Sequence, residues 1–416
     1  MAVSPARRVA YDVLLRVFEQ DAYADRAFRS AAEGLDSRER AFAQRLAYGA
    51  VQLVRPLDLG IEKIGRRPVR KLDPPVRAAL RLGALQLAEL QGVPARAAVD
   101  ESVELVRAAG LERAVPFTNA VMRRLATSLA GFLHSLPAGT PHEAAIKHSY
   151  PDWVAETWWR ELGPEEAIAL MRVQNEPAET VVRVNHRRSA QLEGRPDAEI
   201  PAALHVERVD EAALEAGLLW PQSRGSQLAG LAVGSREGER VLDLCAAPGG
   251  KATQLAGEVV AVEKHPGRAR ELEENCARLG ATNVSVVCAD GLALPGELKG
   301  FDRAIVDAPC SNLGALAARP DARWRATPAP ELQLALLRAA AERVRSAGTI
   351  VYSVCTINAA ENEDVVDATG LTALDLGAEW PGFRHPRRPE FLLTLPHVHG
   401  TSGFFIARLR VDGPAS

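Results

Sequence analysis

Apolar residues in the first 130 positions recur every three or four residues, which is the spacing of one buried face of an α-helix. A first stripe lies near the N-terminus, over residues 9–18. Further stripes cover residues 42–53, 76–87, 99–106 and 117–129. Helices that each bury a single face pack against one another, so this pattern predicts an all-α bundle over residues 1–130.

Start and stop signals between these stripes support the helical interpretation. Asp36 and Glu39 precede the second stripe with the spacing of a capping box. A segment rich in Gly, Ser, Pro and Thr over residues 131–141 predicts a linker. The region from 131 to 229 is mixed, with helices expected at 152–162 and 164–174 and a strand at 180–185.

From about residue 230 the pattern changes to short β-rich runs separated by helical segments. The predicted strands cover residues 240–244, 259–262, 285–287, 301–306 and 348–353, and helices are expected from Lys251, Gly267, Pro328 and Asn358. Two last runs, 392–395 and 403–409, have no helix between them and predict an antiparallel pair. This alternation is typical of a doubly wound, Rossmann-like α/β domain, here over residues 230–416.

Charge is distributed unevenly along the chain, although the net charge of its 416 residues is only −3. Residues 1–130 carry +6, and the remainder carries −9. A basic helical domain on an acidic body suits the binding of a polyanion. Ordinary solvated, arginine-rich helix faces explain the same numbers equally well, so charge alone does not decide.

Several classes of protein are disfavoured. No apolar run approaches membrane-spanning length, and the N-terminal stripe lacks the compact apolar stretch of an export signal. The five cysteines include no C-x-x-C pair, which argues against both a zinc site and a disulfide framework. We expect a cytoplasmic protein with free thiols, no metal and no membrane contact, and we expect it to be a monomer.

A glycine-containing turn follows the first strand of the predicted α/β domain. It comprises Cys245, Ala246, Ala247, Pro248, Gly249, Gly250 and Lys251. Glycines allow a ligand to approach the backbone where a side chain would collide. The spacings of a dinucleotide-binding fingerprint and of a P-loop are both absent.

Acidic residues stand at three successive strand ends. Glu263 lies 20 residues after Asp243, where a carboxylate suits a ribose diol, and Asp290 can accept a hydrogen bond from an adenine amino group. Any one of these acids is as often a helix or turn cap, but three together favour a ligand site. Because an acidic crevice suits a sulfonium ion better than a pyrophosphate, S-adenosylmethionine (AdoMet) is the expected cofactor.

Two cysteine-containing motifs follow the next two strands. They are Asp307-Ala308-Pro309-Cys310-Ser311 and Ser353-Val354-Cys355-Thr356. A predicted helix over 327–346 separates them, so the strands should be parallel neighbours that bring both thiols and Asp307 to one cleft. A lone cysteine after a strand is usually inert filler, which is our interpretation of Cys245, Cys276 and Cys288.

This set of groups suits methylation of a pyrimidine carbon. A thiolate that adds to C6 of cytosine breaks the aromaticity of the ring and makes C5 nucleophilic toward a sulfonium methyl group. A base or proton relay must then remove the C5 proton and expel the thiolate. Amino-methylating enzymes carry N/D-P-P-Y where this chain has Asp307-Ala308-Pro309-Cys310, which argues against attack by an exocyclic nitrogen.

These motifs resemble those of the RNA cytosine-C5 methyltransferases, a family that includes bacterial rRNA enzymes and eukaryotic nucleolar relatives. The resemblance covers nearly the whole chain: residues 1–130 are similar to the NusB-type RNA-binding domain, notably over 117–124. It implies AdoMet-dependent methylation of C5 of a cytidine in RNA, with 16S rRNA as the expected substrate. A tRNA substrate and a non-catalytic RNA-binding assembly factor are the alternatives.

The resemblance also implies roles for individual residues. The loop from Cys245 to Lys251 would bind AdoMet, with Lys251 also taking part in catalysis. Glu263 would hold the ribose, Asp290 the adenine, and Asp307 would lie between the cofactor and the base. Cys355 would be the nucleophile, and Cys310 would help to release the product.

Two positions depart from the family pattern. Val354 replaces the usual threonine before the nucleophile, and Ala317-Ala318 stands where many members carry two arginines. Since the same stretch retains four candidate RNA-binding side chains, we expect this loop to contact RNA. They are Arg319, Arg323, Trp324 and Arg325.

Overall fold

The computed structural model describes residues 3–90, 92–188 and 191–412. The chain divides into two compact units. The first contains Met1–Asn175 and Leu316–Arg325, and the second contains Glu176–Ala315 and Ala326–Ser416. The boundaries expected at residues 130 and 230 therefore do not coincide with the boundaries of these units.

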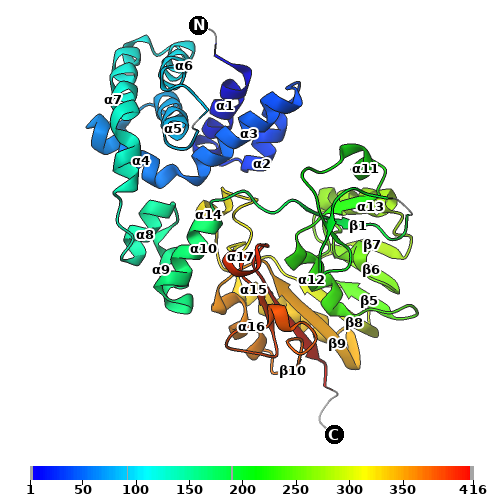
Figure 1. Ribbon diagram of the computed structural model, residues 1–416. Coiled ribbons are helices and arrows are strands. Elements are labelled where there is room, and N and C mark those ends of the chain that lie inside the picture. The colour runs from blue at the N-terminus through cyan, green and yellow to red at the C-terminus, as the bar shows by residue number, and fades with distance from the viewer. Residues whose placement is uncertain (1–2, 91, 189–190, 413–416) are drawn as a thin grey trace. The chain divides into compact units, whose positions relative to one another are not determined.

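The first unit is helical, and its first seven helices form the predicted bundle (Figure 1). They are α1 (Pro5–Glu19), α2 (Ala24–Ala31), α3 (Ser37–Gln52), α4 (Val54–Gly65), α5 (Pro74–Glu89), α6 (Ala95–Ala108) and α7 (Val115–His134). The stripes read from the sequence meet in one apolar core, where Leu46, Leu80 and Leu125 are buried. The all-α prediction for this part of the chain is confirmed.

Three further helices belong to the same unit: α8 (Pro141–His148), α9 (Asp152–Leu162) and α10 (Pro164–Val173). Helix α7 continues to His134, so the first part of the predicted linker is helical. Asp36 caps α3 by accepting hydrogen bonds from the amides of Arg38 and Glu39. The Glu39 carboxylate accepts from the amide of Ala6 at 3.1 Å, so the expected capping box is not completed.

The segment Leu316–Arg325 joins the helical unit from a distant part of the sequence. Arg323 is fully buried there, with its guanidinium 4.3 Å from the ring centroid of Tyr150. It also donates a hydrogen bond to Oδ1 of Asn175 at 2.8 Å. The Trp324 indole N–H donates to the carbonyl of Val51 at 3.0 Å. The expectation that Arg323 contacts RNA was therefore wrong, because its side chain is buried within the unit, whereas the half-buried Trp324 leaves that expectation a prediction.

The second unit is built on an eight-stranded sheet with the order β10-β12-β9-β8-β5-β6-β7, in which β11 pairs with β12 (Figure 1). The parallel strands are β5 (Arg240–Asp243), β6 (Glu258–Glu263), β7 (Val284–Cys288), β8 (Phe301–Asp307) and β9 (Val344–Val354). The antiparallel strands are β10 (Thr372–Leu374), β11 (Leu392–Thr394) and β12 (Phe404–Arg410). The predicted parallel β8–β9 neighbours and the antiparallel pair at the end of the chain are both confirmed.

Helices cover both faces of this sheet. Helices α12 (Arg224–Val233) and α13 (Pro266–Leu279) contribute to one apolar cluster with Val241, Ile305 and Val351. Helix α15 (Pro330–Ala341) contacts β8 and β9 outside that cluster, and α16 (Glu363–Asp367) packs against α15. The fold is therefore doubly wound, as predicted. The helix expected from Lys251 was wrong, because only the 3-10 turn η3 (Ala252–Gln254) forms there.

A smaller antiparallel sheet supports the cofactor end of the unit. Its order is β2-β3-β1-β4, formed by β1 (Val181–Val184), β2 (Arg195–Pro196), β3 (Ala203–His205) and β4 (Leu219–Pro221). Arg183 of β1 donates to the side chains of Gln222, at 2.9 Å, and Thr253 of η3, at 2.8 Å. Across the residues with a described placement, no helix is long and apolar enough to cross a bilayer.

Candidate active site

The predicted site residues gather at the carboxyl ends of the parallel strands. Asp243 ends β5, Glu263 ends β6 and Asp307 ends β8, while Asp290 and Cys355 lie just beyond β7 and β9. Strand β5 lies between β6 and β8. Strands β6 and β7 follow on one side of it, and β8 and β9 follow on the other. This is the topological switch point, where ligands of open α/β sheets bind.

The loop after β5 is a tight turn shaped by two glycines. The Gly249 amide donates to the carbonyl of Ala246 at 2.8 Å, and the φ angle of Gly249 is +108°. A Cβ on Gly249 would lie 2.7 Å from Leu272, and one on Gly250 would lie 2.8 Å from the Trp220 indole nitrogen. Both glycines are thus required by packing within the protein, in addition to any ligand.

Helix α13 holds the outer part of the same loop. The carbonyl of Ala247 accepts from Arg268 at 2.8 Å, and the carbonyl of Pro248 accepts from Asn275 at 2.9 Å. Arg268 also lies 3.5 Å from the buried carboxylate of Glu263. The Glu263 side chain accepts from the amide of His265 at 2.8 Å, which fixes its orientation beside the loop.

Asp290 stands beyond the neighbouring strand and is partly exposed. Its Oδ2 pairs with Nζ of Lys264 at 2.8 Å, and its Oδ1 accepts from the amide of Leu292 at 3.0 Å. The hydrogen bond from Lys264 lowers the pKa of Asp290 below its ordinary value, so the side chain is a carboxylate at neutral pH. Its remaining lone pairs can accept a further donor, such as an adenine amino group.

Asp243 is a site residue to which the sequence analysis gave no specific role. It is almost fully buried, and no side chain of the described residues donates a hydrogen bond to either of its carboxylate oxygens, although the backbone of Cys245 lies close enough to lower its pKa. Burial and the charge of Asp307 raise the pKa of Asp243 to about 7, and Lys251 opposes this shift. A buried carboxylate with no side-chain hydrogen bond is unfavourable, and a bound cation would relieve it. The cofactor end therefore fits AdoMet, whose sulfonium is positive.

Asp307 connects the cofactor end to the cysteines. Its Oδ2 accepts from Nζ of Lys251 at 2.7 Å, and its Oδ1 accepts from the hydroxyl of Ser353 at 2.7 Å. The Lys251 ammonium also lies 5.1 Å from the ring centroid of Phe404. The last residue of the cofactor loop is thus fixed to the strand that leads to Cys310, and Ser353 extends this link to the strand of Cys355.

The two cysteines of the motifs are in contact. Their Sγ atoms lie 3.5 Å apart, and the Cys355 thiol donates to Oδ1 of Asn312 at 3.1 Å. The side-chain Nδ2 of Asn312 donates to the carbonyl of Cys310 at 2.8 Å, and the φ of +59° at Asn312 is a left-handed conformation that asparagine tolerates. The contact with Cys355, together with burial, raises the pKa of Cys310 well above its ordinary value. Cys310 therefore keeps its proton near neutral pH.

The other cysteines do not share this environment. Burial raises the pKa of Cys276 to about 11 and also raises the pKa of Cys245, so neither supplies a thiolate near neutral pH. Cys288 lies exposed at the end of the edge strand β7. In the described ranges, no group of three or more His, Cys, Asp or Glu residues is placed to hold a metal ion.

Comparison with known proteins identifies the family. Residues 231–410 match 16S rRNA methyltransferase RsmB/F, and residues 4–127 match the NusB family. A probable ribosomal RNA small subunit methyltransferase B from Synechocystis sp. is 34% identical, over 97% of this chain and 99% of its own length. This chain belongs to the RsmB/F methyltransferase family.

Other relatives agree with this assignment. The ribosomal RNA small subunit methyltransferase B of Thermus thermophilus is 34% identical, over 99% of this chain and 98% of its own. The structure of NSun6 from Pyrococcus horikoshii with SFG has a TM-score of 0.58 and 23% identity, over 64% of this chain and 100% of that chain. The Thermus enzyme confirms the family resemblance seen in the motifs. The NSun6 structure shows a shared fold.

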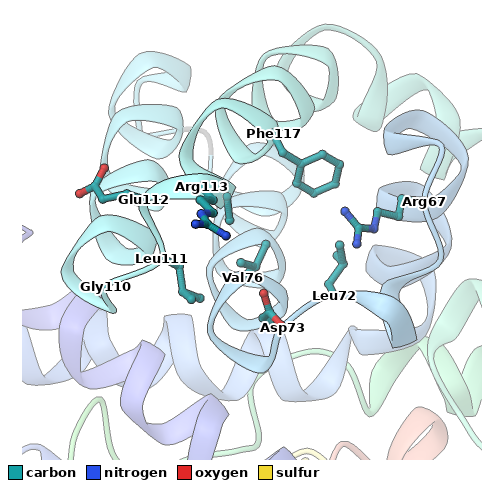
Figure 2. A pocket seen from close by; sticks show the side chains of 10 residues that line it. Arg67, Leu72, Asp73, Val76, Gly110, Leu111, Glu112, Arg113 and Phe117 are labelled. Carbon is teal, nitrogen blue, oxygen red and sulfur yellow. The ribbon is translucent and has the colours of Figure 1, made fainter.

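The NusB-type unit of this RsmB/F member carries a second candidate surface. A cavity of about 480 Å³ lies between the α4–α5 and α6–α7 connections (Figure 2). Phe117 and Arg67 line it, with the guanidinium 5.4 Å from the ring centroid, and Arg113 lines it as well. Further exposed cations lie in the α4–α5 connection, at Arg66, Arg70 and Lys71, and on α7, at Arg123 and Arg124. None of these seven cations forms an ion pair with another residue whose placement is described.

Proposed function

We propose that this chain transfers the methyl group of AdoMet to C5 of a cytidine in 16S rRNA through a covalent adduct with cysteine. The observation that carries this proposal is the contact between the Cys310 and Cys355 thiols, 3.5 Å apart, next to the Asp307–Lys251 ion pair. Two thiols with a carboxylate and an ammonium supply the nucleophile, the proton relay and the charge stabilisation that C5 methylation needs.

The cofactor would be held by residues on three neighbouring strands. The loop from Cys245 to Lys251 would enclose it, Glu263 would accept both ribose hydroxyls, and Asp290 would accept from the adenine amino group. Asp243 would place negative charge near the sulfonium, which supplies the methyl group when AdoMet is bound.

The two thiols would have different roles, with Cys355 as the nucleophile and Cys310 as the base that removes the C5 proton. As a thiolate, Cys355 adds to C6 of the cytosine, while Asp307 and Lys251 stabilise charge on the ring. Once the sulfur is bonded to carbon, its negative charge no longer acts on Cys310, whose pKa then falls. Cys310 can therefore release its proton to solvent and, as a thiolate, accept the proton from C5 after methylation. Loss of that proton expels Cys355 as a thiolate and restores the starting state.

The helical unit would bind the RNA. Its unpaired cations attract phosphates, and Phe117 offers a face on which an unpaired base can stack. We accordingly assign residues 1–130 to RNA binding, 131–229 to an intermediate region and 230–416 to catalysis. We further propose that the protein acts as a monomer in the cytoplasm.

A direct assay tests this function. The purified full chain is incubated with deproteinised 16S rRNA, from a strain that lacks the corresponding gene, and with AdoMet labelled in the methyl group. Digestion and mass spectrometry should place the label on C5 of a single cytidine. Label that appears only in tRNA, or on an exocyclic nitrogen, would contradict the proposal.

A further inference from the structure

A buried carboxylate lies next to both cysteine loops and is not used in the chemistry above. Glu361, at the end of the 3-10 turn η4 (Ala359–Glu361), has no exposed surface. Its carboxylate accepts hydrogen bonds from the amide of Ser311 at 3.0 Å, from Gln333 at 2.9 Å, from the amide of Ala329 at 3.3 Å and from Asn358 at 3.3 Å. The Ser311 hydroxyl is a fifth partner.

These contacts join the residues that directly follow the two cysteines. Ser311 follows Cys310, and its hydroxyl lies 2.7 Å from that of Thr356, which follows Cys355. Gln333 donates at the same time to Glu361 and, at 2.9 Å, to the carbonyl of Pro309. The backbone on each side of Cys310 is therefore held by this one network.

The position of Glu361 is itself fixed from the strand that carries Cys355. The Tyr352 hydroxyl donates to the Glu361 carbonyl at 2.6 Å, and Tyr352 lies on β9. Burial raises the pKa of Tyr352 well above its ordinary value, so it remains a hydroxyl donor.

Glu361 also lacks a basic partner among the described residues. Four of its five partners are N–H groups, which can only donate. No arginine, lysine or histidine of the described chain lies within ion-pair distance of it. The contact with Cys355 and burial are the larger causes of the raised pKa of Cys310, and the negative charge of Glu361 adds to them.

Building on the proposed function, we propose that Glu361 is a positioning residue for the reaction. Its carboxylate holds the loops of Cys310 and Cys355 in contact, and its charge opposes the ionisation of Cys310 together with Cys355 and burial. Glu361 acts through Ser311, Thr356 and Gln333.

The first test measures the thiols without any substrate. Alkylation of Cys310 by iodoacetamide is followed against pH by mass spectrometry in the wild type, in Glu361→Gln and in Glu363→Gln. The control Glu363 is another buried carboxylate, bonded to His385 at 2.8 Å and not to either cysteine loop. The pH of half-maximal alkylation should fall in Glu361→Gln, because a thiolate is easier to form once the negative charge is removed. It should remain unchanged in Glu363→Gln.

The second test measures turnover. Glu361→Gln should lower kcat by about tenfold or more, because its amide cannot accept all five hydrogen bonds, with KM for RNA and AdoMet changed by less than about twofold. Glu361→Asp keeps the charge on a shorter side chain, so it should restore the alkylation midpoint without restoring kcat. If Glu361→Gln does not fold, Glu361→Asp provides the test. This variant should have the wild-type alkylation midpoint and a lowered kcat.

Three outcomes would overturn the proposal. One is a Glu361→Gln variant with the wild-type kcat. Another is a loss of activity in Glu361→Gln while the pH of half-maximal Cys310 alkylation stays unchanged. The same holds if Glu363→Gln shifts this pH as much as Glu361→Gln does. The third is a Glu361→Asp variant that fails to restore the midpoint. Since alkylation requires no RNA, it decides the role of Glu361 even if the wild type proves to methylate another substrate.

Discussion

The Sγ atoms of Cys310 and Cys355 lie 3.5 Å apart, although the two residues are 45 positions apart in the chain. They meet because β8 and β9 are parallel neighbours, in register at Asp307 and Ser353, and each cysteine follows the carboxyl end of its strand. The contact couples the protonation of one thiol to that of the other. The role of each cysteine therefore depends on the other cysteine as well as on its own sequence motif.

The raised pKa of Asp243 predicts that cofactor binding depends on pH. Below about pH 7 this carboxyl is protonated and cannot attract a sulfonium, so the Kd for AdoMet should fall as pH rises through about 7 and then level off. Isothermal titration calorimetry on the full chain measures this directly. In Asp243→Asn the dependence should disappear, and a pH-independent Kd in the wild type would contradict the prediction.

The same residue predicts a stability effect of opposite direction in the cofactor-free protein. Because the folded state holds the proton of Asp243 more tightly than the unfolded state, with a pKa of about 7 against 3.8, its contribution to the free energy of unfolding is lost as pH rises across that interval. Asp243→Asn should therefore stabilise the protein relative to the wild type more at pH 8 than at pH 5, as measured by urea unfolding without AdoMet. An equal difference at both pH values would contradict the assigned cause.

Replacing Arg323, which the sequence suggested as an RNA contact, should greatly lower the stability of the protein. Arg323→Ala removes the hydrogen bonds to Asn175 and Ser149 and the stacking on Tyr150, and should lower the free energy of unfolding by about 3 kcal/mol. Arg319→Ala, an exposed arginine of the same segment, is the matched control and should change it by less than about 0.5 kcal/mol. Equal effects of the two variants in urea unfolding would argue against the anchoring role.

The cavity next to Phe117 predicts where RNA binding is lost. Arg67→Ala should weaken binding of a 16S rRNA fragment and reduce the slope of log K against log salt by about 0.7 to 0.9. Phe117→Leu keeps an apolar side chain but removes the aromatic face, and should weaken binding by about 1 to 3 kcal/mol without changing that slope. Arg96→Ala, on the exposed side of α6, is the control for charge alone. If all three variants bind as the wild type, the RNA contact lies elsewhere.

The sequence predicted those helices and strands whose apolar residues recur at regular spacing. Helix α9 and strand β8 were predicted to within one residue, because apolar periodicity is a local signal. The helix expected from Lys251 failed for a local reason too, since β6 begins at Glu258 and leaves too few residues for two helical turns.

Other features depended on partners far away in the sequence. Nothing local in Arg323 distinguishes a buried anchor from a surface arginine, and its partners Ser149 and Asn175 are identified only by the fold. The same holds for Gly250, whose close neighbour is Trp220 of the smaller sheet. In the site, the strand-end acids and the cysteine motifs could be read directly. Asn312 and Glu361 could not, because their roles come from hydrogen bonds that join separate loops.

The proposed mechanism requires the sulfur of Cys355 to bond to a pyrimidine carbon, and a variant that cannot complete the reaction should trap that bond. Cys310→Ala lacks the proposed relay, so incubation with 16S rRNA and AdoMet should produce a covalent protein–RNA adduct that migrates slowly on a denaturing gel. The adduct should map to Cys355 by mass spectrometry. Cys355→Ala should bind AdoMet with the wild-type Kd but transfer no methyl group, and the double variant should form no adduct. Methyl transfer by Cys355→Ala, or the absence of an adduct with Cys310→Ala while turnover continues, would contradict the account.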